Sequence, residues 1–163
     1  MLIRLPDAAA TIELGQQLAG PLAEGVGQGP LAVHLGGPLG AGKTTLARGL
    51  LRGLGHAGRV RSPSFTLLEP YELANCRVFH LDLYRLADAA ELDDLGVADL
   101  FEPGSLVLVE WAERGGSRLP VPDLRLALDY EGEGRRVACN AHSAVGARSL
   151  EVLALARRRV LPR

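Results

Sequence analysis

A glycine-rich octapeptide constrains the fold of this chain more than any other feature. Residues 37–44 read Gly-Pro-Leu-Gly-Ala-Gly-Lys-Thr, an unbroken match to the phosphate-binding pattern G-x-x-x-x-G-K-[ST]. Its glycines let successive backbone N–H groups turn inward around a phosphate, and the positive end of a following helix faces the same anion. Lys43 can then reach the terminal phosphates, and the Thr44 hydroxyl can hold Mg²⁺. The predicted nucleotide-binding residues here are Gly37, Gly40, Ala41, Gly42, Lys43, Thr44 and Thr45.

The sequence on both sides of this loop fits a strand followed by a helix. Residues 31–35 form a short, mostly apolar run that is typical of a buried strand. Between residues 44 and 54 leucines recur at helical spacing, and Gly55 then ends the run. A glycine-rich turn that matched the pattern by chance would not require a strand before it and a helix after it. The presence of both therefore favours a genuine phosphate-binding loop (P-loop).

The length and composition indicate a single folded unit. Of the 163 residues 47% are hydrophobic, which is enough for one core, and a P-loop fold of this length leaves little room for more. We therefore predict one P-loop ATPase domain over residues 1–163. The net charge of −1 gives no electrostatic reason for nucleic-acid or membrane binding, and the short arginine runs at 135–136 and 157–159 are typical of solvated surface.

Cysteine use and the absence of targeting signals predict a cytoplasmic protein. Cys76 and Cys139 lie in apolar stretches without CxxC spacing, which indicates buried free thiols rather than a disulfide or a metal site. The first residues lack the features of a signal peptide, and no apolar run approaches the length of a transmembrane helix. A reducing, cytoplasmic setting and no membrane partner are expected.

The rest of the chain alternates between helical and extended patterns. Helices are predicted over residues 7–22, 88–101 and 145–159, the second with a capping-box start at Asp88 and Glu91. Strands are predicted over 66–72, 77–83, 105–109, 123–130 and 135–140, the first two forming a hairpin. The prediction is an α/β fold, a single P-loop NTPase domain with a mixed, mostly parallel sheet, helices on both faces and an antiparallel hairpin.

Two acidic residues come at the ends of apolar strands. Asp82 follows Val-Phe-His-Leu, and Glu110 follows Leu-Val-Leu-Val. An α/β sheet places its chemistry at strand ends, and a P-loop ATPase needs a carboxylate near magnesium and a group that positions water. Either acid could instead mark only where its strand leaves the core. Residues 62–66, Ser-Pro-Ser-Phe-Thr, read either as a proline turn or as a switch loop whose hydroxyl senses the γ-phosphate.

These segments together resemble the TsaE (YjeE) family, bacterial ATPases required for the threonylcarbamoyladenosine (t6A) modification of tRNA. The matching blocks are the P-loop, VRSPSFTLLEPY at 60–71, HLDLYRL at 80–86, EL and LG at 91–92 and 95–96, and EW ahead of LP at 110–111 and 119–120. The resemblance spans roughly residues 5–136, and its middle blocks are far more specific than the P-loop alone.

Residue roles follow from that resemblance by position. It implies that Lys43 and Thr44 bind phosphate and magnesium, and that Asp82 and Glu110 lie by the metal. It further implies that Thr11 and Arg135 approach the nucleotide. The chain departs from the family at Pro38, where an acidic residue is usual, and at Ser64, where threonine is usual. Ser64 keeps a hydroxyl for a switch role toward the nucleotide, whereas Pro38 loses a charge and a backbone donor.

The function implied is an ATPase whose output is a conformational change. Its cofactors would be ATP or ADP and Mg²⁺, with Lys43, Asp82 and Glu110 as the catalytic residues. TsaD and TsaB, which transfer the threonylcarbamoyl group to tRNA, would be its partners, and tRNA would be contacted only indirectly. Hydrolysis would reset that assembly between turnovers. Because no arginine is placed as an internal finger, we expect slow hydrolysis by the isolated chain and stimulation by its partners.

Other functions of a P-loop remain open at this point. A small-molecule or nucleotide kinase would need a second phosphate clamp, for which the acidic residues 91–102 are poorly suited. A GTPase would usually carry an Asn-Lys-x-Asp element, which is lacking. A non-catalytic nucleotide sensor would use the same loop, and loss of turnover on Glu110→Ala without loss of partner function would reveal it.

Overall fold

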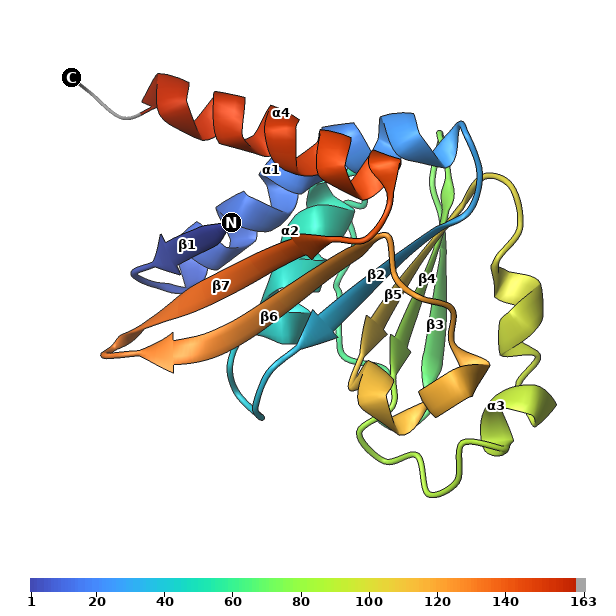
Figure 1. The fold of residues 1–163 in the computed structure, drawn as a ribbon. Coiled ribbons are helices and arrows are strands. Elements are labelled where there is room, and N and C mark those ends of the chain that lie inside the picture. The colour runs from blue at the N-terminus through green and yellow to red at the C-terminus, as the bar shows by residue number, and fades with distance from the viewer. Residues whose placement is uncertain (161–163) are drawn as a thin grey trace.

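Parallel strands at the centre of one sheet position the glycine-rich loop (Figure 1). The computed structural model describes residues 1–160. The strands are β1 (Leu2–Leu5), β2 (Leu31–Gly36), β3 (Leu68–Glu72), β4 (Arg77–Asp82), β5 (Ser105–Glu110), β6 (Leu124–Glu131) and β7 (Gly134–Ala141). Their spatial order is β1-β7-β6-β2-β5-β4-β3. The three central pairs, β6–β2, β2–β5 and β5–β4, are parallel, and the outer pairs are antiparallel.

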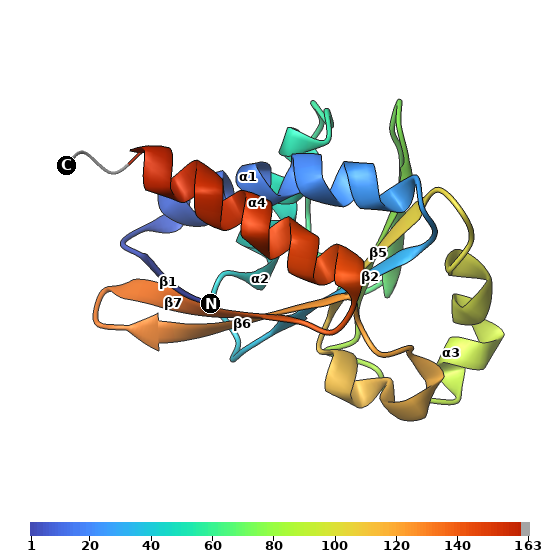
Figure 2. The ribbon, with the colours of Figure 1, turned by 45° about the horizontal axis from the view of Figure 1, so that its top comes forward.

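Three long helices lie on one face of the sheet, and short helical turns lie on the other (Figures 1 and 2). The long helices are α1 (Ala8–Val26), α2 (Lys43–Gly53) and α4 (Ala144–Val160). The opposite face carries α3 (Glu91–Asp94) and the 3-10 turns η1 (Val97–Leu100), η2 (Ala112–Arg114) and η3 (Gly116–Arg118). Because side chains alternate along β5, Leu106 and Leu108 join the core under the long helices, and Val107 and Val109 join the other core.

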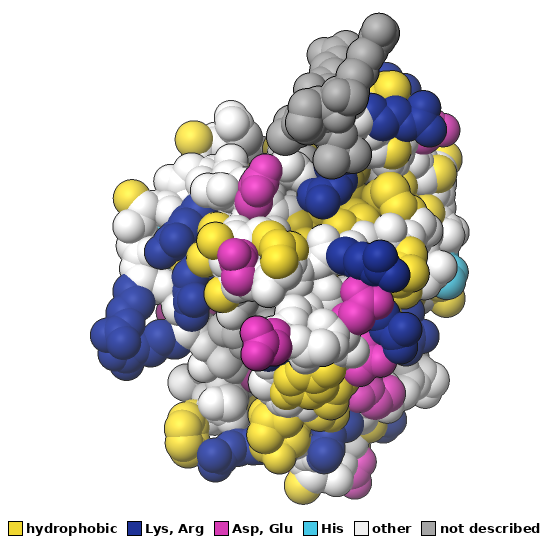
Figure 3. Space-filling model, turned by 90° about the vertical axis from the view of Figure 1, so that its left-hand side faces the viewer, with side chains coloured by type: hydrophobic (Ala, Val, Ile, Leu, Met, Phe, Trp, Pro, Cys, Tyr) yellow, Lys and Arg dark blue, Asp and Glu magenta, His cyan; other side chains and the backbone are white. Residues whose placement is uncertain are grey.

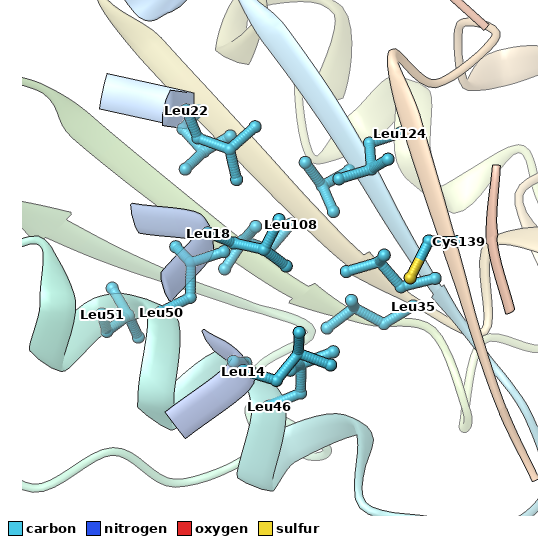
Figure 4. Close-up of a cluster of buried hydrophobic side chains, with 14 of the residues drawn as sticks. Leu14, Leu18, Leu22, Leu35, Leu46, Leu50, Leu51, Leu108, Leu124 and Cys139 are labelled. Carbon is cyan, nitrogen blue, oxygen red and sulfur yellow. The ribbon is translucent and has the colours of Figure 1, made fainter. Parts of the chain in front are cut away.

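The larger core is built from leucines that project toward each other from α1, α2 and the sheet (Figure 4). Leu14, Leu18 and Leu22 recur at every fourth position of α1, so they share one helix face. They meet leucines of α2 and the central strands, and all of these side chains are almost fully buried. This packing fixes α2, and therefore the loop that precedes it, against the sheet.

The structure confirms the predicted α/β class and most of the predicted elements. The predicted pairs at 66–83 and 123–140 are the antiparallel hairpins β3–β4 and β6–β7. Cys76 and Cys139 are buried free thiols, as predicted. Within residues 1–160, no helix has both the length and the apolar character required to span a membrane.

Two elements differ from the prediction. The helix predicted over 88–101 is wrong: it is broken into α3 and η1 by Gly96, whose φ of 67° is incompatible with a continuous right-handed helix. The Glu91 half of the predicted capping box does form, because Glu91 Oε1 accepts the N–H groups of Ala87 and Asp88 at 3.1 and 2.9 Å, whereas Asp88 Oδ1 accepts the N–H of Ala90 rather than that of Glu91. The short strand β1 was not predicted at all, and it pairs with β7 at the far end of the chain.

Candidate nucleotide-binding site

The P-loop has a backbone that only glycine adopts easily. Gly37, Gly40 and Gly42 have φ values of 124°, 77° and 106°, in the region that L side chains rarely occupy. A Cβ at Gly37 would also collide with the carbonyl oxygen of Leu128 on β6. Gly42 precedes the first residue of α2, so the N-terminal end of that helix faces the loop. The predicted strand, loop and helix are therefore present in the order that phosphate binding requires.

Lys43 is held over the loop by backbone carbonyls and an indole ring. Its Nζ donates to the carbonyl oxygens of Gly37 at 2.7 Å and Pro38 at 2.8 Å. The same Nζ lies 4.3 Å from the centroid of the Trp111 ring, a cation–π distance. Burial lowers the pKa of Lys43 below its usual value, and the carboxylates of Glu110 and Asp82 oppose that shift. The contact between Trp111 and Lys43 could not be predicted from sequence, because residues 68 positions apart share no local pattern.

The two strand-end carboxylates lie side by side. Because β4 and β5 run parallel, Asp82 and Glu110 are directly opposed in register, and both are buried. The Thr44 hydroxyl donates to Glu110 Oε1 at 2.9 Å. His80, fully buried on β4, has its Nε2 2.9 Å from the same Oε1 atom. In the sequence His80 is only an interruption of an apolar run. Its pairing with Glu110 could not be predicted, because it depends on the register of β4 and β5.

Asp82 connects the end of β4 to the loop at residues 62–66. The Ser62 hydroxyl donates to Asp82 Oδ2, and the Tyr84 N–H donates to Asp82 Oδ1 at 3.0 Å. Within that loop the Leu67 N–H donates to the Pro63 carbonyl at 2.7 Å, which closes a turn. The proline turn is therefore present with a hydroxyl bonded to Asp82, and the switch role of this loop stays a prediction.

All of the predicted site residues except Gly37 line two cavities on either side of the P-loop. The larger, about 380 Å³, is lined by Gly40, Gly42, Lys43, Thr44, Thr45, Ser62, Ser64, Asp82, Tyr84, Arg85, Glu110 and Trp111, together with Leu39. The smaller, about 140 Å³, is lined by Asp7, Thr11, Gly40, Ala41, Gly42, Thr45 and Arg135, among others. Gly40, Gly42 and Thr45 border both, so the two cavities adjoin at the loop.

The smaller cavity is closed by residues from the two ends of the chain. Thr11, buried on α1, donates its hydroxyl to the Asp7 carbonyl at 3.1 Å. Arg135 lies over the Tyr130 ring, with its Cζ 4.4 Å from the centroid, and its Nη2 is 3.4 Å from the Gly40 carbonyl. The Tyr130 hydroxyl donates to the Leu39 carbonyl at 2.7 Å. The β6–β7 hairpin thus holds the P-loop from outside, a contact of Tyr130 that the sequence did not reveal.

The donor set of the larger cavity fits a nucleotide with magnesium. In residues 1–160 no group of three or more His, Cys, Asp and Glu side chains could hold a metal ion. Mg²⁺ is typically bound through one or two carboxylates together with substrate phosphates and water, because it dehydrates reluctantly. Thr44, Asp82 and Glu110 supply a hydroxyl and two carboxylates, all oxygen donors, beside the lysine and the helix end that suit phosphate.

Comparison with known proteins gives the family. Residues 5–138 match the family described as threonylcarbamoyl adenosine biosynthesis protein TsaE. The tRNA threonylcarbamoyladenosine biosynthesis protein TsaE of Haemophilus influenzae is 41% identical over 142 residues, which cover 87% of this chain and 90% of that protein. The protein of the same name from Synechocystis sp. is 42% identical over 114 residues, 68% of this chain and 69% of that protein.

A solved structure shares the whole fold. The crystal structure of Bacillus subtilis YdiB has a TM-score of 0.78 with this chain at 25% identity, and the match covers 96% of this chain and 95% of that one. The match of the family over most of the chain agrees with the P-loop, the strand-end acids and the loop at residues 62–66 described above. This chain is a member of the TsaE family.

Proposed function

We propose that this chain is a Mg²⁺-dependent ATPase that serves the t6A modification of tRNA. The observation that supports it best is the convergence of Lys43, Thr44, Asp82 and Glu110 on one cavity beside the P-loop. The names of its relatives give the process, because they are called tRNA threonylcarbamoyladenosine biosynthesis proteins. ATP is its substrate, ADP its product and the cytoplasm its expected compartment.

Each residue of the cavity has a role in this proposal. Mg²⁺, when bound, would neutralise part of the negative charge of the phosphates. Lys43 leaves its carbonyl partners for the terminal phosphates, and the backbone N–H groups of Gly40, Ala41 and Gly42 surround them. Thr44 and Glu110, already hydrogen-bonded to each other, hold the metal side. Asp82 and Glu110 orient the attacking water, and Thr11, Thr45 and Arg135 bind the rest of the nucleotide.

The switch in this proposal is the loop at residues 62–66. Ser62 is tied to Asp82, and Ser64 lines the cavity, so the loop borders both the metal side and the γ-phosphate side of the site. Hydrolysis removes the γ-phosphate and with it the contacts that favour one loop arrangement. TsaD and TsaB would read that change and be reset for the next turnover.

Contact with tRNA is indirect in this proposal. Binding to RNA by phosphate contacts needs a concentration of positive charge. The net charge is −1, and on the face shown in Figure 3 Lys and Arg side chains alternate with Asp and Glu side chains. The transferase partners, rather than this chain, would hold the tRNA.

Phosphate release with ATP as the only substrate tests the enzymatic part of the proposal. We expect slow release by the purified chain that requires Mg²⁺, is lost in Lys43→Ala and falls by about 10² or more in Glu110→Gln. Addition of TsaD and TsaB should raise the wild-type rate, since a partner can contribute about 10³ or more. Release that persists in Lys43→Ala, or that requires a phosphate-accepting metabolite, would contradict the proposal.

Partner capture tests the switching part. Immobilised wild-type protein should retain TsaD and TsaB to different extents in ATP and in ADP. Lys43→Ala should retain the same amount in both nucleotides, because it cannot distinguish them. Equal capture by the wild-type protein in ATP and ADP would contradict a nucleotide-dependent switch.

A further inference from the structure

Arg85 contributes a second cationic side chain to the larger cavity, and its position has a structural cause. It follows β4 and lines the cavity together with Lys43, Asp82 and Glu110. The segment that carries it is anchored on both sides by the buried residues Leu83 and Leu86. The Leu83 N–H also donates to the Glu110 carbonyl at 3.1 Å, so Arg85 is tied to the strand end that bears the catalytic carboxylate.

The charges in the cavity leave a role for this guanidinium. Lys43 faces two carboxylates, Asp82 and Glu110, before any phosphate enters. A transferring phosphoryl group spreads further negative charge over its outer oxygens, and stabilising it requires positive charge fixed in advance. Within the described part of the chain, no oxygen accepts a hydrogen bond from Arg85 and no carboxylate pairs with it. Its five donors are therefore free for an anion.

The Arg85 side chain is held by the switch loop. Its Cζ lies 4.2 Å from the centroid of the Phe65 ring, within cation–π range. Phe65 is 81% exposed, which is unusual for a phenylalanine and is not explained by packing in the core. The same loop bonds to Asp82 through Ser62, so it contacts the segment 82–85 at both of its ends.

We infer that Arg85 is a cis-acting arginine that stabilises the transferring γ-phosphoryl group, with Phe65 as its positioning residue. This inference rests on the proposed ATPase function. The switch loop then controls the rate as well as reporting the nucleotide state, because any movement of Phe65 moves the guanidinium. Both side chains are exposed, so a partner that covers the Phe65 ring would fix Arg85 and accelerate hydrolysis.

Single-turnover phosphate release and ADP affinity, measured on the same variants, test this inference. Arg85→Ala should slow release by about 10²- to 10³-fold and leave the Kd for ADP unchanged, since ADP lacks the phosphoryl group that Arg85 contacts. Arg85→Lys should recover part of the rate. ADP with aluminium fluoride, a mimic of the transferring group, should bind tightly to the wild-type protein and weakly to Arg85→Ala.

Variants of Phe65 and two other arginines make the test specific. Phe65→Leu should slow release without changing ADP affinity, and Phe65→Tyr should restore the rate because it keeps the ring. Arg59→Ala removes an exposed arginine outside the cavity and should have no effect. Arg114, stacked near Tyr84 and Trp111 but outside the cavity lining, is the competing candidate.

The outcomes separate this inference from the function on which it rests. Three results would overturn the role of Arg85. Arg85→Ala could release phosphate at the wild-type rate, or it could lose affinity for ADP and ATP equally. Alternatively, Arg114→Ala, rather than Arg85→Ala, could lose the rate. In all of these cases Lys43→Ala would still be inactive. Failure of the wild-type protein to release phosphate, or release by Lys43→Ala, would contradict the ATPase function itself.

Discussion

At the scale of single residues, the site depends on side chains and backbone segments whose conformations are restricted by their neighbours. Glu110 Oε1 is shared by Thr44, which lines the cavity, and by His80, whose contact is fully buried, where an unmatched polar atom is expensive. Gly37 is restricted in another way, since its backbone conformation and the nearby Leu128 carbonyl each exclude a side chain. These restrictions give the P-loop and the strand-end acid one arrangement before ligand binds.

Gly37→Ala is predicted to weaken nucleotide binding by distorting the loop. The added Cβ collides with the backbone of β6, so the loop must shift, and ADP affinity measured by calorimetry should fall by about tenfold or more. Gly132→Ala is the matched control: its φ is 59°, but no atom lies near the added Cβ. That variant should lose only about 1 kcal/mol of stability and keep its ADP affinity. Equal ADP affinity in both variants would argue against a preformed loop.

His34 on β2 is predicted to make stability depend on pH. Burial and the nearby Arg125 lower its pKa from 6.5 to about 4, with His142 acting in the same direction and Glu113 against it. The unfolded chain therefore binds more protons than the folded chain between these pH values, so stability should fall as the pH drops from 6.5 to 4. Urea unfolding at a series of pH values should show a loss of about 1–2 kcal/mol, allowing for solvent screening, that is absent in His34→Phe. Parallel pH curves for the two proteins would refute this.

At the scale of elements, the position of the P-loop depends on how closely α1 crosses α2. Gly15 of α1 faces the backbone of Leu46 and Gly49, and Gly49 of α2 faces the backbone of Ile12. Neither glycine has an unusual φ, so close approach alone explains them. This contact lets Leu14 and Leu18 reach the core leucines of α2 shown in Figure 4.

Two glycine substitutions in α1 should differ clearly in their effect on stability. Gly15→Ala places a Cβ against the backbone of α2 and should destabilise the protein by about 1–3 kcal/mol. Gly20→Ala, in the same helix, meets no atom within 4 Å apart from its chain neighbours, and it should change stability by less than about 1 kcal/mol, because the gain in helix propensity is opposed by contact between the new Cβ and the ring of Pro21. Thermal unfolding of both variants measures this, and similar shifts would mean that the helices are not in close contact.

Sequence patterns predicted the elements whose signals are local. The apolar run of β2, the leucine spacing of α2 and the two hairpins depend on neighbouring residues, and all are present. Strand β1 has only four residues and exists because β7 pairs with it, so its own sequence carries no signal. The break at Gly96 has no clear signal in the sequence, because an acidic, leucine-containing segment is compatible with a helix. Only the positive φ of Gly96 shows that the helix is interrupted.

The residues of the candidate site were likewise predictable where their signal is local, and their contacts across separate strands were not. Lys43 and Thr44 belong to a contiguous motif, and Asp82 and Glu110 end strands that any parallel sheet brings together. The contacts made by His80 and Trp111 depend on register and on side-chain direction across separate strands, which no linear spacing encodes. For the same reason, Arg85 could be placed in the cavity only from the structure.

At the scale of the whole molecule, one edge of the sheet gathers every part of the proposed ATPase. The parallel strands β2, β5 and β4 end there with the P-loop, Glu110 and Asp82, and the loop at residues 62–66 lines the same cavity through Ser62 and Ser64. The β6–β7 hairpin and α1 border the adjoining cavity from the other side. Chain segments far apart in sequence therefore surround the proposed nucleotide site. A nucleotide bound there would contact all of these segments and could change the surface that they form.

The t6A yield of a reconstituted transferase tests most directly whether hydrolysis in this site resets the partner assembly. TsaD, TsaB, tRNA, ATP and a threonylcarbamoyl donor would be combined with the wild-type chain or with Glu110→Gln, and t6A would be counted per assembly. We expect many t6A per assembly with the wild-type chain and about one with Glu110→Gln, because ATP then binds but is not cleaved. Equal yields from the two proteins, with ATP hydrolysis lost in the variant, would contradict it.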